Sequence, residues 1–307
     1  MKPAIREEPA LTRAEAQVVG DRLGERVARI QPTRWGWATP GAVVQLGSGR
    51  RIVVQRRPVA EVDRLTRATA ALAVAGVPVA PILMRVAAGS ADLIAFDHVQ
   101  GDVAATRLDG RHGDATAASM GQALVGLRSV PASSLSVDPA WSGPVALASA
   151  ISGWIAADNW DQAMAAVAGA ACRVVAQKPW HHVPSHGDFV PVNVVFDGPI
   201  LSAIVDLDDV AIRHPLVDPA WWCLVVGHHH PSIFPGRRRV FLAAAGVTDP
   251  TRDLVAVAVL RSLQVAASTS PGRRAGAQAL VASAASQWIE TEESSHSRAS
   301  SQHQPGG

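Results

Sequence analysis

The sequence is poor in several residue types that whole classes of proteins require. It has two cysteines, Cys172 and Cys223, and this number excludes a domain built on disulfide bonds. It contains no run of about 18 or more apolar residues, so we expect no membrane-spanning helix. The segment MKPAIREEPALTRAE also lacks the apolar core of a secretory signal peptide. We therefore expect a cytoplasmic protein with both cysteines buried in its core.

Lysine is almost missing, and tyrosine is missing altogether. Only Lys2 and Lys178 are lysines among the 28 basic residues, and all the others are arginines. Together with the many alanines, this bias is typical of genomes rich in G and C. Any chemistry that requires a lysine must therefore use one of these two residues, or an arginine must replace it.

The charge of the chain is also small, because 28 basic and 26 acidic residues leave a formal net charge of +2. The arginines are scattered and form no long basic stripe, so binding to nucleic acid is not expected. The 307 residues are 48% hydrophobic and 18% charged, which is typical of a soluble globular protein with one large or two modest domains. The oligomeric state stays open.

The first hundred residues predict a leading helix, followed by two β-hairpins with a second helix between them. The leading helix is expected over 12–28, where Thr12 and Glu15 form a capping box. Pro58 can open the second helix, and Gly76 can end it. The strands are expected over residues 42–46, 51–55, 81–86 and 93–98.

After the second hairpin the pattern changes to helices. These are expected over residues 115–129, 145–157, 159–176, 217–227, 237–245, 251–267 and 273–290. A strand–turn–strand over 193–206 interrupts them. The polar segment 291–307 has too few apolar residues to pack and is predicted to be disordered. We therefore predict an α+β protein with a sheet-rich lobe over 1–97, a connector over 98–101 and a helical lobe over 102–290.

One segment carries polar residues that need a chemical explanation. Asp188 lies in the loop Ser-His-Gly-Asp-Phe-Val-Pro-Val-Asn, Asn193 ends that loop, and Asp206 ends the hairpin that follows. Phosphoryl transfer needs a carboxylate that accepts a proton from the attacking hydroxyl, and oxygen ligands that hold Mg²⁺ against a triphosphate. Asp188 suits the first role, and Asn193 with Asp206 suits the second.

The motif His-Gly-Asp-Phe-x-Pro-x-Asn, with Ile-Val-Asp and Pro-x-x-Asp-x-Ala-Trp-Trp after it, resembles a known family. This family is the aminoglycoside phosphotransferase-like and choline kinase-like branch of the protein-kinase-like fold. The resemblance implies a bilobal fold, with a small antiparallel-sheet N-lobe and a larger helical C-lobe. It also implies transfer of the γ-phosphate of ATP or GTP, with Mg²⁺, to a hydroxyl of a small molecule such as an antibiotic, a sugar or an amino alcohol.

By the same resemblance, each polar residue of the motif has an expected role. Asp188 is expected to be the catalytic base, and Asn193 and Asp206 are expected to bind the metal. His186 and Asp218 are expected to support the catalytic loop rather than to react.

Three other carboxylates near such motifs have different expected roles. Asp208 is a secondary candidate for binding the metal or the substrate, and Asp209 is expected to be a solvated loop carboxylate. A second His-Gly-Asp sequence ends at Asp114, but no asparagine follows five residues later and no hairpin ending in aspartate comes after it. We therefore interpret that sequence as an ordinary loop.

The phosphates of the nucleotide require a cation, which in the family is a basic residue on the third strand, oriented by a glutamate of the following helix. We predict Arg56 for this role, since a neutral Gln55 cannot offset the charge of phosphate. Gln55 and Arg57 stay as alternatives, because side chains alternate between the faces of a strand and one arginine of the pair can face the cleft. Glu61 is the predicted partner.

The base of the nucleotide is expected at the connector, where Asp97 and Val99 would contact adenine through the main chain. The loop over 35–41 would cover the phosphates, although it has only two glycines.

The substrate and one rival function stay open at this point. Asp253 is the only acid between residues 250 and 289, which argues against a polycationic aminoglycoside as substrate. The alternative function is a kinase-fold pseudoenzyme that binds a nucleotide or ligand without turnover. A protein kinase is disfavoured, because no Ala-Pro-Glu segment follows Asp206. The run His228-His229-His230 is not expected to bind a metal, because consecutive helical residues do not share a face.

Overall fold

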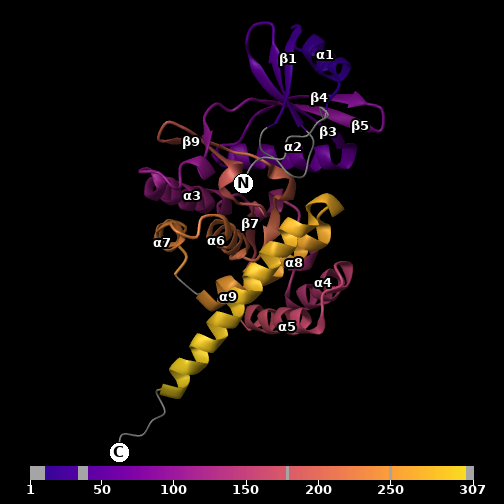
Figure 1. The fold of residues 1–307 in the computed structure, drawn as a ribbon. Helices are drawn as coiled ribbons and strands as arrows, with labels where there is room; N and C mark the ends of the chain where they lie inside the picture. The colour runs from indigo at the N-terminus through magenta and orange to yellow at the C-terminus, as the bar shows by residue number, and fades with distance from the viewer. Residues whose placement is uncertain (1–10, 34–40, 178–179, 249–250, 302–307) are drawn as a thin grey trace, which may run out of the picture.

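The computed structural model describes residues 11–33, 41–177, 180–248 and 251–301. The N-terminal part consists of α1 (Arg13–Arg22), β1 (Val27–Pro32), β2 (Gly41–Leu46), β3 (Arg51–Pro58), α2 (Val59–Val74), β4 (Ile82–Ala88) and β5 (Ala91–Asp97). Its sheet is antiparallel, with the strand order β1-β2-β3-β5-β4. Figure 1 shows this sheet at one end of the molecule, with α2 between it and the helical part.

The first helix, α1, begins as predicted but ends earlier. The Thr12 hydroxyl accepts a hydrogen bond from the Glu15 N–H at 3.2 Å, and the Glu15 carboxylate accepts one from the Thr12 N–H at 2.9 Å. This reciprocal pair is the predicted capping box. The helix was expected to extend to residue 28, whereas it ends at Arg22. Gly24 has a φ of +71°, which turns the chain out of the helix and toward β1.

The two faces of β3 meet different surroundings, because side chains along a strand alternate. Ile52 and Val54 are buried in a small hydrophobic cluster that also contains Val19 of α1. Arg56 continues this face, and the side chain of Arg57 lies on the other face, where it approaches Glu61 of α2. Helix α1 therefore covers the face of β3 that carries Arg56, and Arg57 is left on the face toward α2.

A second and larger hydrophobic cluster extends from α2 through the whole helical part. Val62, Leu65 and Leu72 of α2 belong to it. β5 contributes to both clusters in alternation, since Leu93 lies in the small cluster and Ile94 in the large one.

The C-terminal part is mainly helical. Its helices are α3 (Gly113–Arg128), α4 (Pro144–Ala157), α5 (Gln162–Ala176), α6 (Val217–His229), α7 (Phe234–Ala244), α8 (Thr251–Ser268) and α9 (Arg274–Ser301). Its short strands are β6 (Asp102–Val103), β7 (Val183–Ser185), β8 (Val194–Asp197), β9 (Ile200–Ile204) and β10 (Ala211–Arg213). The 3-10 helices are η1 (Ala104–Thr106), η2 (Ala132–Ser134), η3 (Pro139–Trp141), η4 (Pro191–Asn193), η5 (Leu207–Asp209) and η6 (Pro271–Arg273). β7 pairs with β10, and β8 pairs with β6 and β9.

The last helix differs from the prediction. Disorder was predicted from residue 291, but α9 continues to Ser301 and runs away from the rest of the molecule in Figure 1. Contacts with α8 hold its middle turns, because Arg252 donates to the Glu292 carboxylate at 2.6 and 3.0 Å. The guanidinium of Arg252 also lies over the Trp288 ring, 5.9 Å from its centroid. The polar segment that was predicted to be disordered is therefore helical as far as Ser301, and Arg252 of α8 contacts one side of this helix.

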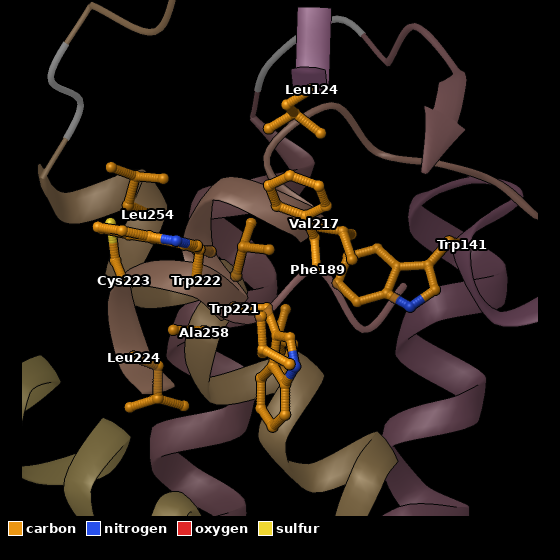
Figure 2. Close-up of a cluster of buried hydrophobic side chains, with 14 of the residues drawn as sticks. Leu124, Trp141, Phe189, Val217, Trp221, Trp222, Cys223, Leu224, Leu254 and Ala258 are labelled. Carbon is orange, nitrogen blue, oxygen red and sulfur yellow. The ribbon is translucent and has the colours of Figure 1, made fainter. Parts of the chain in front are cut away.

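The core of the helical part is built around large aromatic side chains. Trp222 of α6 is fully buried and stacks on Phe241, with ring centroids 3.9 Å apart. Figure 2 shows this cluster, in which Phe189 of the catalytic loop also packs. Cys172 and Cys223 are buried and free, as predicted. Within the described ranges no helix is long and apolar enough to cross a membrane.

Candidate active site

The backbone of the predicted catalytic loop, Ser185–Asp188, depends on a glycine. Gly187 has a φ of +83°, in the left-handed region that favours glycine. A Cβ at this position would lie 2.6 Å from the Arg213 guanidinium and 2.6 Å from the Asp209 carbonyl oxygen. No larger residue fits without displacing the loop, so the glycine of the His-Gly-Asp motif has a steric reason.

The buried carboxylate of Asp218 accepts hydrogen bonds from the loop and fixes its backbone. Asp218, in the first turn of α6, accepts hydrogen bonds from the Ser185 hydroxyl at 3.0 Å and from the main-chain N–H groups of His186 and Gly187, each at 2.8 Å. The side chain is 3% exposed. Hydrogen bonds to an ionised acceptor are stronger than those between neutral groups, so Asp218 stabilises the loop conformation effectively.

His186 is fully buried and bridges the loop to the next hairpin. Its Nδ1 accepts the Asp188 N–H at 3.2 Å, which leaves Nε2 to donate to the Val205 carbonyl oxygen at 3.0 Å. Both ring nitrogens are used within the protein, and this assigns the neutral tautomer with the proton on Nε2. The geometry fits a supporting residue.

The carboxylate of Asp188 is fixed on both sides and partly exposed. The Asn193 side-chain amide donates to Oδ2 at 2.9 Å and also to the Asp188 carbonyl oxygen at 2.9 Å. The indole N–H of Trp221 donates to Oδ1 at 2.7 Å. An ionised carboxylate can accept about four hydrogen bonds, so two acceptor sites are left for a hydroxyl that approaches from solvent.

Asp206 lies beside Asp188, at the end of the β8–β9 ribbon that begins at Asn193. It has a φ of +61° and a ψ of +58°, a left-handed conformation that is costly outside glycine and is found at functional sites. Burial raises the pKa of Asp206 to about 7, and the charges of Asp208 and Asp188 add to this rise. These carboxylates therefore repel one another unless a cation or a proton intervenes.

A magnesium ion fits the donor atoms of this corner. Mg²⁺ is usually bound by one or two carboxylates together with substrate phosphates, rather than by a complete protein cage. The described residues contain no group of three or more His, Cys, Asp or Glu side chains that could hold a metal alone. Asp206 supplies one hard oxygen. The amide nitrogen of Asn193 is committed to Asp188, so its amide oxygen can supply the second.

On the nucleotide side, Arg57 and not Arg56 lies near Glu61, the predicted partner of the phosphate-binding arginine. Arg56 is about half exposed and pairs with Glu15 of α1. Arg57 is 3% exposed, and its guanidinium lies 2.5 Å from the Asp208 carboxylate and 3.9 Å from the Glu61 carboxylate. Glu61 therefore faces the neighbouring arginine of the pair, and the prediction of Arg56 as its partner is wrong. Arg56 lies on the face of β3 that packs against α1, so its side chain pairs with Glu15 of α1 and not with Glu61 of α2.

Asp208 and Gln55, for which the sequence predicts other roles, also contact Arg57. Asp208, a candidate for the metal or the substrate, forms an ion pair with it. Gln55, an alternative for the phosphate position, accepts from its guanidinium at 2.8 and 3.0 Å. Gln55 thus holds the Arg57 guanidinium in place, and its role at the phosphate position stays a prediction.

Asp97, the last residue of β5 before the connector, uses its polar groups within the protein. The Asp97 N–H donates to the Pro81 carbonyl oxygen at 2.9 Å, and the Asp97 carboxylate pairs with Arg50 at 3.2 Å. Burial, with the charge of Arg51, lowers the pKa of the intervening His98. Contact of the adenine with Asp97 and Val99 stays a prediction. The phosphate-covering loop predicted over 35–41 lies outside the described residues up to its last glycine.

A charge network behind the loop was not predicted from the sequence, and in it Asp138, Arg213 and Arg261 are buried whereas Asp209 is 42% exposed. Asp209, expected to be solvated, accepts from Arg213 at 2.9 Å and from Arg261 of α8. Burial would raise the pKa of Asp209, but the two guanidiniums outweigh it and lower that pKa. Arg213 also donates to Asp138 at 2.7 Å. Asp138, Arg213 and Arg261 come from three distant segments, so no local pattern marks them.

The second His-Gly-Asp was predicted to be an ordinary loop, but Gly113 and Asp114 begin α3. Asp114 pairs there with Arg237 on the surface. The histidine run lies at the end of α6, where His228 and His229 are in its last turn.

Solved structures of phosphotransferases share this fold. The apoenzyme of macrolide 2'-phosphotransferase MphH from Brachybacterium faecium is 19% identical, with a TM-score of 0.59 over 86% of this chain and 96% of that chain. The GDP complex of aminoglycoside 2'-phosphotransferase-IIIa is 14% identical, with a TM-score of 0.65 over 91% and 97%. A thermostable mutant of aminoglycoside phosphotransferase APH(4)-Ia, with AMP-PNP and hygromycin B, is 17% identical, with a TM-score of 0.67 over 90% and 99%.

These likenesses confirm the predicted α+β fold of the protein-kinase-like type, with a small antiparallel sheet and a helical C-terminal part. No curated protein sequence matches the chain significantly. The sequence model of the phosphotransferase enzyme family matches residues 17–260, a range that holds the catalytic loop, the β8–β9 ribbon and Arg57. Since this match spans most of the chain, the protein belongs to the phosphotransferase enzyme family.

Proposed function

We propose that this protein transfers the γ-phosphate of ATP or GTP to a hydroxyl group of a small molecule, with Mg²⁺. The observation that carries the proposal is the position of the Asp188 carboxylate. It is partly exposed, both of its oxygens are held by neutral donors, and Asp206 lies beside it. The family supports phosphotransfer in general, and the nucleotide, the metal and the acceptor are the proposed parts.

Asp188 would act on the acceptor. The hydroxyl oxygen attacks the γ-phosphorus, its proton passes to a carboxylate oxygen of Asp188, and the bond from the γ-phosphorus to the bridging oxygen breaks. The nucleoside diphosphate leaves with the bonding electrons. Phosphoryl transfer depends mostly on positioning and on charge stabilisation, so a fixed carboxylate suits the task.

Asp206 and the amide oxygen of Asn193 would hold Mg²⁺, which supplies positive charge to the phosphate oxygens. Arg57 would contact the phosphates as the basic residue of the third strand. Its planar guanidinium can donate two parallel hydrogen bonds to a phosphate, which a lysine cannot do. Glu61 and Gln55 would keep it oriented.

The acceptor class is an antibiotic, a sugar or an amino alcohol. Relatives of the same fold include a macrolide phosphotransferase and an enzyme with bound hygromycin B. Helix α8 and the first half of α9 contain Asp253 as their only acid, which favours an acceptor with few positive charges. A macrolide or a neutral sugar is therefore the first acceptor class to test.

The test is a panel of macrolides, aminoglycosides, sugars and amino alcohols, incubated with ATP or GTP and Mg²⁺ and examined by mass spectrometry. We expect one acceptor to gain a single phosphoryl group. Asp188→Asn should lower the turnover number about 100- to 10,000-fold, the usual contribution of a general base. The matched control is Asp114→Asn, in the second His-Gly-Asp, which should keep full activity. Equal activity of Asp188→Asn and wild type would refute the role of Asp188.

The rival function, binding without turnover, is favoured by one observation. The guanidinium of Arg57 is already engaged by Gln55 and Asp208, so its N–H groups are partly occupied before any phosphate arrives. Under this function, ATP or GTP would raise the melting temperature with no transfer to any acceptor. Phosphate transfer to a single member of the panel excludes it.

A further inference from the structure

We propose that Trp221 is a positioning residue for Asp188, and that Arg261 of α8 supports this arrangement. The proposal rests on the proposed phosphotransfer. It gives a role to Trp221 of α6, to which the motif assigned none, and it adds Arg261 of α8, which lies outside the motif. Trp221 acts on the side chain of Asp188, and Arg261 acts on the loop that carries it.

The hydrogen bonds of Asp188 give the first argument. Trp221 Nε1 donates to Oδ1 at 2.7 Å, the shorter of the two side-chain hydrogen bonds to this carboxylate. Asn193 donates to Oδ2 at 2.9 Å. With one donor on each oxygen, rotation about the bond that carries the carboxylate breaks both hydrogen bonds. The remaining lone pairs therefore point in fixed directions, which is what a group that receives a proton from an oriented hydroxyl requires.

The position of Trp221 on α6 gives the second argument. Trp221 follows Asp218 by three residues, and residues at this spacing lie on the same face of a helix. Asp218 accepts from the loop main chain, whereas Trp221 donates to the loop side chain. One face of α6 thus fixes both the backbone and the carboxylate of the loop.

Arg261 gives the third argument. It is 4% exposed, and it donates to the Gly187 carbonyl oxygen at 2.9 Å and to the Asp209 carboxylate. Its guanidinium carbon lies 5.9 Å from the centroid of the Trp221 ring, within the range of a cation–π contact. Gln264 fixes the other end of the guanidinium at 2.6 Å. Arg261 therefore holds the loop next to Asp188 and lies against the ring that orients Asp188.

The neighbouring Trp222 supplies an internal comparison. It is the same residue type, is equally buried and leaves α6 in another direction, toward Leu254 (Figure 2). It stacks on Phe241, and in the described part of the chain its indole N–H has no hydrogen-bond acceptor. Trp222 thus contributes packing alone, and Trp221 contributes packing and a hydrogen bond to the catalytic carboxylate.

The experiment compares Trp221→Phe with Trp222→Phe, because each substitution keeps a ring and removes an indole. The probe is Mg·ATP, with the acceptor found by the panel or with water as the acceptor. We expect Trp221→Phe to lower kcat about 10- to 100-fold, which corresponds to one lost hydrogen bond to a charged group, and to change the KM for ATP less than about threefold. Trp222→Phe should lower the melting temperature and keep kcat within about threefold.

A double-mutant cycle separates positioning from general damage. If Trp221 acts through Asp188, Trp221→Phe should lower kcat much less in the Asp188→Asn protein than in the wild type. Arg261→Lys should lose less kcat than Arg261→Met, because it keeps one donor for Gly187. Two results with an active wild type would overturn the positioning role and leave the proposed function standing. One is an equal loss of kcat in Trp221→Phe and Trp222→Phe. The other is a double variant in which the separate losses of Trp221→Phe and Asp188→Asn simply multiply. A wild type without any turnover overturns the proposed function, and the positioning role with it.

Discussion

Two charged side chains, Asp188 and Arg57, belong to the proposed active site, and the protein holds them in different ways. Asp188 is partly exposed and accepts its side-chain hydrogen bonds from the neutral groups of Asn193 and Trp221. Arg57 is buried and pairs with the charged groups of Asp208 and Glu61. The carboxylate of Asp188 is thus oriented by neutral donors, and no cation offsets its charge through these hydrogen bonds. The charge of Arg57, by contrast, is offset by carboxylates before any phosphate binds.

This difference matches the two proposed tasks. A group that accepts a proton must keep its charge until the acceptor arrives, and neutral donors allow this. A buried cation without an anionic partner would destabilise the fold, so a carboxylate has to accompany it until phosphate binds. Under the proposed function, a phosphate competes with Asp208 for the N–H groups of Arg57.

Replacement of Arg57 tests the cation side and should have a larger effect than replacement of Asp206 or Arg56. Arg57→Gln removes the buried charge that would contact the phosphates, so we expect the KM for ATP to rise about 10- to 100-fold. Arg57→Lys should lose less, because it keeps the charge but not the paired donors. Steady-state kinetics at fixed Mg²⁺ measure both. An unchanged KM in Arg57→Gln would show that the phosphates bind elsewhere.

The pH dependence of magnesium binding tests the acidic side and should have an intermediate effect. The folded protein raises the pKa of Asp206 from an ordinary value near 4 to about 7, so between these limits the folded state binds more protons than the unfolded one. Asp206 therefore lowers stability as the pH rises through this window. Mg²⁺ displaces the proton, so the rise in melting temperature on adding Mg²⁺ should be larger at about pH 8 than at about pH 6.

Asp206→Asn is the control for this titration. It removes the titrating group, so its melting temperature should depend less on pH, and the response to Mg²⁺ should shrink at both pH values. If the wild type responds equally to Mg²⁺ at about pH 6 and about pH 8, the raised pKa of Asp206 does not govern binding.

Replacement of Arg56 should have the smallest effect and sharpens the distinction between neighbouring arginines. Arg56 and Glu15 form an ion pair at the surface, and such pairs contribute about 0 to 1 kcal/mol. Arg56→Gln should change the unfolding free energy, measured in urea, by less than about 1 kcal/mol and should keep the KM for ATP. A loss of nucleotide affinity in Arg56→Gln, with Arg57→Gln unaffected, would restore the prediction made from the sequence.

The sequence predicts the parts of this molecule that are determined locally. The catalytic loop and the β8–β9 hairpin are short in sequence, so Asp188, Asn193 and Asp206 could be grouped from their spacing. Arg56 and Arg57 could not be told apart, because a one-residue difference reverses the face of a strand and the packing of α1 decides which face is covered.

Other parts depend on packing between distant segments. Trp221 lies inside the recognised motif, but its hydrogen bond to Asp188 depends on its side-chain direction, which no spacing encodes. Arg261 reaches the loop only because α8 packs against it, 74 residues further along the chain. The continuation of α9 beyond residue 290 depends in the same way on Arg252 of the neighbouring helix.

The division of the apolar side chains into two clusters has a consequence for dissecting the protein. The sheet and α1 form the small cluster, but Val62, Leu65 and Leu72 of α2 are buried by the helical part. A fragment that ends at residue 97 would therefore expose one whole side of α2 to water, although it contains every strand of the sheet. The N-terminal lobe is recognisable as a unit of sequence, and we expect that it does not fold without the helical part.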